Sequence, residues 1–343
     1  MSLNLQCKPK IFIKNQDVNV ESFDINFQGK NRINSCNLKI NHNLVDWSRL
    51  FNEEVKIYLN ENDGKPIFRG FIKQVVPSDT NLNITVYDPR YLLTSKEGIP
   101  INITDKDNYD GYTVSQFLID YIDKYVNTDK IYIGTDYISD TVISTLMGSL
   151  RGLQDDLYSI VQRALEKSID DTDIDNLVGY IIDVVDDGTK AQLIIQKEKL
   201  LSSVPSLTLS EVDGIENIMY TKRMPPSYST HFTNDGRSGS YQHGNMPYGR
   251  INESSKGNFE NPADATYASM ISVLQQQDNV AEIKATINRG YDVNLGSIVL
   301  LNVDDFNIKG KHRVTTKRLS YSKNSMKCVL GLNTKPVTLK GYI

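Results

Sequence analysis

Residues 55–87 read VKIYLNENDGKPIFRGFIKQVVPSDTNLNITVY, and residues 296–332 read GSIVLLNVDDFNIKGKHRVTTKRLSYSKNSMKCVLGL. Both segments run strand, polar turn, glycine-containing strand, turn, strand, because apolar and polar residues alternate between clusters of Asn, Asp, Ser and Gly. The spacings of the two segments differ by only a few residues. An internal repeat of this kind predicts two related β-barrels within one chain.

The first barrel is expected to occupy residues 1–98. Further alternating segments before residue 55 lie at residues 11–13, 23–27 and 36–40. Short strands separated by Asn, Asp and Gly turns are typical of an antiparallel barrel or sandwich. We expect a strand near residues 214–224 to complete this barrel.

An acidic α/β module is predicted at residues 99–213. A helix is expected over residues 113–125, with Thr113 as its N-cap, because the apolar residues there share one helical face. A second helix is expected near residues 153–167, and a hairpin over residues 179–195 turns at Asp186-Asp187-Gly188.

The remaining residues, 225–343, are predicted to form a long polar loop, a helix and the second barrel. The loop covers residues 225–262, where Gly, Ser and Asn leave few apolar residues for a core. A helix near residues 262–276 and strands near residues 281–287 and 297–303 follow. The predicted fold class is therefore mainly β, with an inserted α/β module and two related tube-type β-barrels.

Composition excludes several classes of protein. The 343 residues suit two or three domains, since single cores rarely exceed about 250–300 residues. A formal net charge of −4 gives no general attraction to nucleic acid, and no apolar run reaches the ~18–20 residues that span a bilayer. The N-terminal residues MSLNLQCKPK lack a signal-peptide core, so synthesis in the cytoplasm is expected.

No catalytic, cofactor or metal site is predicted. Cys7, Cys36 and Cys328 are too widely spaced for a zinc site or a disulfide framework, and we expect them to be small buried or half-buried residues. The Asp-rich run at residues 170–176 begins like a calcium loop, but Asn176 and Ile182 stand where that loop needs Gly and Glu. No pair of the four histidines has HExxH spacing, and no phosphate-binding glycine motif or raised-pKa carboxylate pair is present.

Charge is segregated along the chain. Residues 101–216 hold 22 acidic and 9 basic residues, whereas residues 284–343 hold 11 basic and 3 acidic residues. Unlike surfaces of this kind favour docking within an assembly. The candidate interface residues are Lys309, Lys311, Arg313, Lys317 and Arg318, and charge reversal at the last three is expected to impair assembly. A nucleic-acid-binding ribbon is disfavoured, because the protein is acidic and the stretch has little aromatic interleaving.

Three stretches together resemble the tail-tube hub proteins of bacteriophages and related contractile particles, the late control protein D-like baseplate hub group. The first runs from Val55 through Phe68-Arg-Gly-Phe-Ile72 to Asp88-Pro-Arg-Tyr-Leu-Leu93. The second, residues 150–164 with the 179–195 hairpin, is similar to the inserted small domain of that family. The third, from Val293 to Leu332, looks like the closing strands of its second barrel.

The resemblance implies a structural hub without catalysis or cofactor. Such a protein forms a homotrimer of pseudo-sixfold symmetry that joins the sixfold tail tube to the threefold central spike, beneath the tape measure protein and beside other baseplate proteins. It would be assembled in the cytoplasm of a bacterial host and would reside in the virion tail baseplate, or in a contractile injection system. No specific nucleic-acid binding and no membrane insertion are expected.

Two alternatives remain open at this point. A carbohydrate- or receptor-binding β protein at a tail tip could use the Tyr-containing segment 228–267. A cell-wall hydrolase is the least favoured alternative, because no acid/base pair of carboxylates is evident.

Overall fold

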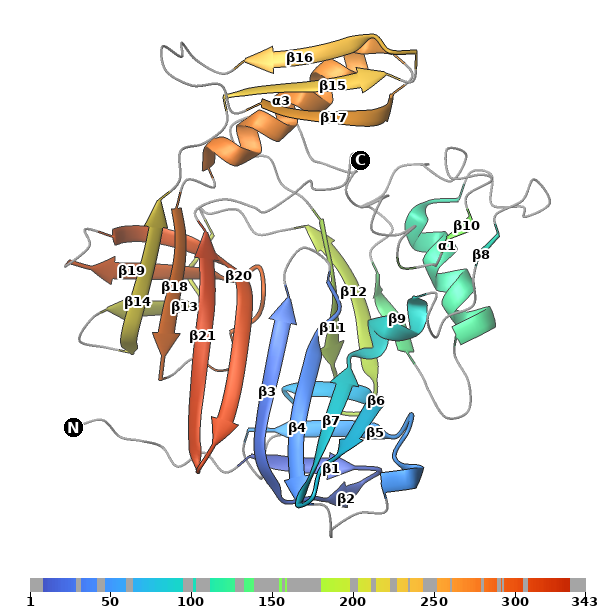
Figure 1. Cartoon of the computed structure of the whole chain (residues 1–343), viewed down its shortest axis with the longest axis vertical. Helices are drawn as coiled ribbons and strands as arrows, with labels where there is room; N and C mark the ends of the chain where they lie inside the picture. Colours follow the sequence, from blue (N-terminus) through green and yellow to red (C-terminus); the bar gives the residue numbers. More distant parts are fainter. Residues whose placement is uncertain are drawn as a thin grey trace.

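The computed structural model shows a mainly β protein (Figure 1). The structure describes residues 9–28, 32–41, 47–59, 64–94, 101–102, 112–126, 133–138, 154–155, 158, 180–197, 203–210, 214–222, 227–233, 235–242, 252–259, 261–278, 281–288, 291, 293–304 and 308–333. No helix within these ranges is long and apolar enough to cross a membrane.

One sheet of 13 strands holds both barrels, in the hydrogen-bonded order β14-β18-β21-β20-β3-β4-β7-β6-β5-β1-β2, and β13 joins it through β19, which also pairs with β20. The N-terminal strands are β1 (Lys10–Ile13), β2 (Gln16–Asp17), β3 (Val20–Gln28), β4 (Ser35–Asn41), β5 (Glu54–Tyr58), β6 (Phe68–Pro77) and β7 (Asn81–Tyr87). The C-terminal strands are β13 (Leu207–Ser210), β14 (Ile215–Lys222), β18 (Ala281–Ile287), β19 (Ile298–Val303), β20 (Ile308–Ser322) and β21 (Ser325–Asn333).

The predicted repeat is present as two matching sets of strand pairs, β5-β6-β7 and β19-β20-β21. In each set the long middle strand pairs first with the preceding strand and then with the following one. The change of partner is accompanied by a bulge, between Ile72 and Gln74 in β6 and between Val314 and Thr316 in β20. A bulge bends a strand, so the part before the bulge can pair with one neighbour and the part after it with another. The prediction of two related barrels is confirmed.

The glycines that marked the repeat in the sequence do not occupy equivalent positions. Gly70 pairs with Val55, and a Cβ at Gly70 would collide with the carbonyl oxygen of Tyr87, so β6 can lie against β7 only with glycine there. Gly310 pairs with Leu301 and has a φ of 130°, a backbone conformation that favours glycine. Gly70 is therefore required for close strand packing, whereas Gly310 is favoured for its backbone conformation.

The strand near residues 214–224 does not complete the first barrel, contrary to the sequence prediction. Within the described ranges β14 pairs with β18, which in turn pairs with β21. The β14–β18 pair matches the β3–β4 pair of the first repeat, with a bulge between Ile215 and Asn217 where β3 has one between Val20 and Ser22. Likewise β13, placed in the α/β module from sequence, pairs with β19 in the second barrel.

The two repeats meet where β20 pairs with β3, from Thr316 opposite Gln28 to Ser322 opposite Ser22. A single hydrophobic core runs through both barrels beneath this junction. Cys36 and Cys328 are buried in that core, as predicted, and burial raises the pKa of the Cys328 thiol to about 12. Cys7 lies outside the described residues.

The α/β module packs its own core against the first barrel. Helix α1 (Val114–Tyr121) begins at Thr113, whose side chain completes a capping box with Gln116, and it continues as the π-helix η4 (Ile122–Val126). The hairpin of β11 (Tyr180–Asp186) and β12 (Ala191–Lys197) is as predicted, and β9 (Ile133–Ile138) pairs parallel to β12. The 170–176 run lies outside the described residues, as does most of the predicted 153–167 helix. Of that predicted helix, Gln154 and Asp155 form the short strand β10, which pairs with β8 (Ile101–Asn102).

The described residues within 225–262 are not a loop, contrary to the sequence prediction. They form the three-stranded sheet β16-β15-β17, which helix α3 covers on one face (Figure 1). Its strands are β15 (Tyr228–Thr233), β16 (Ser238–Gln242) and β17 (Asn252–Phe259), and the helix is α3 (Pro262–Asp278), close to its predicted bounds. Small residues permit close packing of helix on sheet: a Cβ at Gly239 would collide with the backbone of α3.

Candidate functional site: the polar face of the sheet

Hydroxyl and amide side chains follow one face of the sheet across the junction between the two barrels. Their registers place Ser320, Asp24, Asn37 and Thr85 in one row over β20, β3, β4 and β7. We call this surface the polar face and define it as Ser22, Asp24, Asn26, Asn37, Lys39, Asn83, Thr85, Arg318, Ser320, Ser322 and Lys327. Alternate residues of the same strands are buried in the core, so period-two alternation separates a wetted face from a packed one.

The charges on the polar face are largely paired. Arg318 donates from Nε to both carboxylate oxygens of Asp24, at 2.8 and 2.9 Å, across the β20–β3 junction. Lys39 lies 3.0 Å from the carboxylate of Glu21. A groove of about 460 Å³ crosses the face between these strands. The surface therefore offers mainly hydroxyl and amide groups, and its ion pairs join Arg318 to Asp24 and Lys39 to Glu21.

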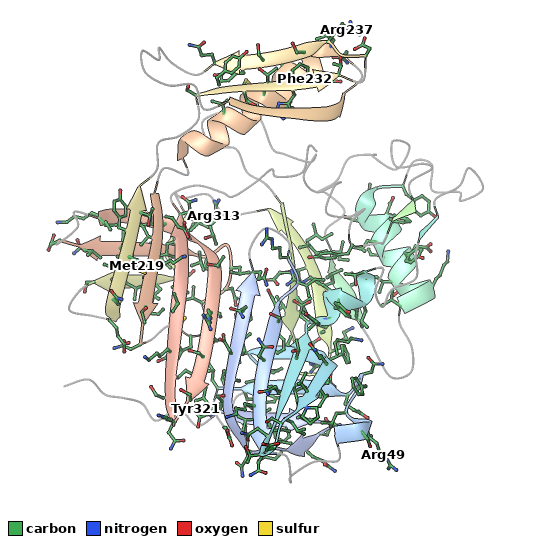
Figure 2. All side chains as sticks on the ribbon, viewed as in Figure 1. Arg49, Met219, Phe232, Arg237, Arg313 and Tyr321 are labelled. Atoms are coloured by element: carbon green, nitrogen blue, oxygen red, sulfur yellow. The ribbon has the colours of Figure 1, made fainter. Side chains whose placement is uncertain are left out.

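Three of the five basic residues predicted at an assembly interface lie in the half of β20 that pairs with β19. Lys309 is exposed and lies 2.5 Å from the carboxylate of Asp304. Lys311 donates a hydrogen bond of 2.9 Å to the carbonyl oxygen of Ser203. Arg313 is 2% exposed (Figure 2 labels its position). The three side chains thus differ in burial and do not form one basic surface.

The other two lie beside the junction and are used within the chain. Lys317 is buried, and its Nζ donates to the carbonyl oxygens of Tyr291 and Val293 at 3.0 and 2.8 Å and lies 4.4 Å from the ring centre of Phe27. Arg318 stays exposed but is paired with Asp24. Lys317 and Arg313 are therefore unavailable to a partner in the folded chain.

A second polar cluster, which the sequence did not reveal, fixes the α/β module to the first barrel. Arg90 is 1% exposed and donates to Asp88 at 2.6–3.1 Å and to the carbonyl oxygen of Ile182, in β11 of the module, at 2.8 Å. Asp88 also accepts from the backbone N–H of Asn34 at 2.7 Å. Burial opposes its charge, but Asp88, Tyr158 and Asp183 together outweigh burial and raise the pKa of Arg90.

Arg69 in β6 also connects the first barrel to the α/β module. It pairs with Asp186 at the end of β11 and donates to the carbonyl oxygen of Thr189 at 3.0 Å. Both arginines lie inside the Phe68-to-Leu93 motif that carried the family resemblance. A sequence signal therefore existed, but alternation alone cannot show that Arg69 in β6, or Arg90 just after β7, contacts another domain.

The histidines show no catalytic or metal-binding arrangement in the part of the chain that the structure describes. His231 lies in β15, not in a loop, and its Nδ1 is 2.9 Å from the hydroxyl of Ser269 in α3. His42 and His243 fall outside the described residues. No group of three or more potential metal ligands occurs among the residues with described positions.

His312 is expected to make the protein less stable in mild acid. Its ring is buried, neither ring nitrogen has a hydrogen-bond partner among the described atoms, and burial lowers its pKa below the ordinary 6.5. The unfolded chain therefore binds the proton first, so the contribution of neutral His312 is complete above pH 6.5 and is lost as pH falls below it.

Urea unfolding at pH 7.5 and 5.5 measures this effect. Wild type should lose more stability than His312→Leu over this range, because only wild type carries a buried imidazole whose pKa burial lowers. Equal losses in the two proteins would show that His312 does not carry the dependence.

Solved structures with a similar fold are known. No family model and no curated protein sequence matches the chain. A tail protein from Neisseria meningitidis shares 13% identity at a TM-score of 0.67, with 96% of this chain and 97% of that chain covered. The 43 kDa tail protein of prophage MuSo2 from Shewanella oneidensis shares 10% identity at a TM-score of 0.69, with 97% and 99% covered.

A third similar structure extends the comparison beyond phages. It is an Escherichia coli component of the type VI secretion system, described as similar to T4 bacteriophage tail proteins, with 10% identity, a TM-score of 0.56, and 96% and 77% covered. At these identities the likeness shows the fold. The chain has the fold of phage tail and tail-like proteins over nearly its full length, as the resemblance in its sequence had implied.

Proposed function

We propose that this protein is the structural hub of a phage tail or phage-tail-like particle, joining the tail tube to the central spike. The observation that carries the proposal is the internal repeat built into one continuous sheet. Because one chain supplies two equivalent strand sets, three chains present six. A homotrimer of this chain would therefore match a sixfold tube on one side and a threefold spike on the other.

The polar face supports a passive role for the sheet. Its hydroxyl and amide groups and its paired charges would let a tape measure protein or nucleic acid pass without strong binding. We propose no catalysis for this protein, in keeping with the tail proteins whose fold it shares. Its place would be the virion tail baseplate, assembled in the host bacterial cytoplasm beside the tube, spike, tape measure and other baseplate proteins.

Native mass spectrometry and negative-stain imaging of the protein, alone and with the spike and tube proteins of the same particle, test this function. We expect a ring of three chains with six similar lobes that binds the spike on one face and the tube on the other. A protein that stays monomeric and binds neither partner would contradict the hub function.

The small β16-β15-β17 sheet is where the alternative function, carbohydrate or receptor binding, would reside. Phe232 is 36% exposed on this sheet (Figure 2), and the opposed residue of β16 is Ser238. An exposed aromatic ring beside hydroxyl groups could stack on a sugar. In the same preparation, binding of a host surface glycan that Phe232→Ala abolishes would favour this alternative over the hub.

A further inference from the structure

We propose that Lys39 and Asn81 form an isopeptide bond within the first barrel, with Glu21 transferring the protons. The bond joins the side-chain amine of β4 to the side-chain carbonyl carbon of β7. It goes beyond the hub function and does not depend on it, because all three groups belong to one chain. The observation behind it is a contact of three side chains on the neighbouring strands β3, β4 and β7 (Figure 1).

A bulge in β3 brings the glutamate to the lysine. Val20 lies opposite Ile40 and Ser22 lies opposite Lys39, so Glu21 is the extra residue between these two pairs. A bulge re-aims the side chain of its extra residue. Oε2 of Glu21 therefore lies 3.0 Å from Nζ of Lys39.

Asn81 meets the same two groups from β7. Lys39 lies opposite Asn83, and Asn81 is two residues from Asn83 on the same face of the strand. The orientation of the Asn81 amide follows from its neighbours, because only one orientation sets its nitrogen against acceptors and its oxygen against donors. Nδ2 then donates to Oε1 of Glu21 at 2.7 Å, and Oδ1 accepts from Nζ of Lys39 at 3.2 Å.

The amide is held in place, whereas the amine can move. The carbonyl oxygen of Thr80 accepts from Nδ2 of Asn81 at 3.2 Å, and the Thr80 hydroxyl donates to Oδ1 at 3.0 Å. Asn81 is 9% exposed, but the side chains of Lys39 and Glu21 are 43% and 47% exposed. Holding an amine beside a fixed carbonyl group lowers the barrier to their reaction. The open side of the site lets the leaving group reach water.

One carboxylate contacts both ends of the reaction. Through Oε2, Glu21 can take a proton from the amine, and through Oε1 it can give a proton to the amide nitrogen. The neutral Nζ of Lys39 attacks Cγ of Asn81 and forms the new C–N bond, while the Cγ–Nδ2 bond breaks. A lysine ammonium and a primary amide thus give a secondary amide and ammonium. Atoms and charge balance, no oxidant is needed, and Glu21 is regenerated.

The second barrel shares the bulge but lacks the reacting pair. Glu216 is the extra residue in the bulge of β14. Matching β14, β18 and β21 to β3, β4 and β7 by their registers puts Thr286 in the place of Lys39 and Lys327 in the place of Asn81. The bulged glutamate is therefore common to both repeats, and the proposed bond is specific to the first barrel.

The bond would restrict the unfolded chain. It would close a loop over residues 39–81, which contains the strands β5 and β6. A covalent link of this kind stabilises a fold by lowering the entropy of the unfolded state, more so for a long loop. Cross-linked wild type should therefore unfold at higher urea concentration than a variant that cannot form the bond.

Intact-mass spectrometry of the purified protein tests for the bond. We expect a loss of about 17 Da, the mass of one ammonia, that develops faster at about pH 9 than at about pH 7 because only a neutral amine attacks. Tryptic digestion should give one branched peptide that joins the segments around Lys39 and Asn81, with no cleavage after Lys39.

Variants assign the three roles. Lys39→Arg keeps a cation beside Glu21 but removes the nucleophile, and Asn81→Ala removes the carbonyl group, so neither should give the branched peptide. Glu21→Gln should slow bond formation by about 100-fold or more, as expected for loss of acid–base catalysis. Lys56→Arg is the matched control, because Lys56 pairs with Glu54 at 2.9 Å in the same barrel, and it should cross-link like wild type. Circular dichroism verifies that each variant is folded.

The outcomes decide between the bond and an ordinary ion pair. An unchanged wild-type mass after prolonged incubation at alkaline pH would overturn the proposal. So would an ammonia loss that persists in Lys39→Arg, since it would arise from an asparagine that cyclises on its own backbone. Bond formation at the wild-type rate in Glu21→Gln would overturn the role of Glu21. None of these results bears on binding of spike or tube, so the hub function keeps its separate test.

Discussion

Replacing Arg90 by Met is expected to lower the free energy of unfolding by about 3–5 kcal/mol, since removing one partner of a buried ion pair leaves the other charge uncompensated. Asp88 is 3% exposed and would keep its bond from the Asn34 N–H, but it would lose the guanidinium. The carbonyl oxygen of Ile182 would lose its donor as well. We therefore expect the α/β module to loosen from the barrel before the barrel itself unfolds.

Urea denaturation and hydrogen exchange together measure this result. Lys124→Met removes an exposed ion pair with Asp120 and should cost under about 1 kcal/mol, so it controls for loss of a cation as such. Adding Asp88→Asn to Arg90→Met should recover part of the loss, because the buried charge disappears while the amide oxygen still accepts from one of the two backbone N–H groups, of Asn34 and residue 90, that bond Asp88. A double variant as unstable as the single one would mean that burial of Asp88 is not the cause.

Charge reversal at Lys317 should prevent stable folding of the chain, in contrast with a defect confined to assembly. Its Nζ donates to two carbonyl oxygens inside the second barrel, and a carboxylate there would face acceptors without a donor. We expect Lys317→Glu to cost about 3–5 kcal/mol. Lys317→Met keeps the buried stem and should cost less.

The comparison that decides this prediction is with Arg318→Glu. Arg318 is exposed and pairs with Asp24 at the junction, so its reversal should cost about 1 kcal/mol or less and leave a folded chain. Soluble expression and the urea midpoint distinguish the two residues. If Lys317→Glu folds as well as Arg318→Glu but fails to assemble, Lys317 belongs to an interface, as the sequence had suggested.

Alternation and turn residues were sufficient to predict most of the two barrels. The strands from Val55 to Tyr87 and from Ile298 to Leu332 are present, because each buries one face and period two then appears in the sequence. The repeat was visible for the same reason. The capped helix at Thr113 was predicted because capping is a local interaction between neighbours.

The errors have physical causes as well. The β15 and β16 strands are rich in Ser, Thr and Gly, because the face under α3 needs small residues, so they look like a loop in sequence. Strand β14 was given to the wrong barrel, because alternation identifies a strand without naming its neighbour. The basic residues of β20 looked like one surface, yet Lys317 is buried and Arg318 exposed, since successive residues of a strand face opposite sides.

The continuous sheet also sets a width. Eight strands, β14, β18, β21, β20, β3, β4, β7 and β6, follow one another in each chain. At ~4.8 Å spacing they span about 34 Å from the first strand to the last. Because the number of strands fixes this span, the side chains of the polar face could vary while the sheet keeps its width.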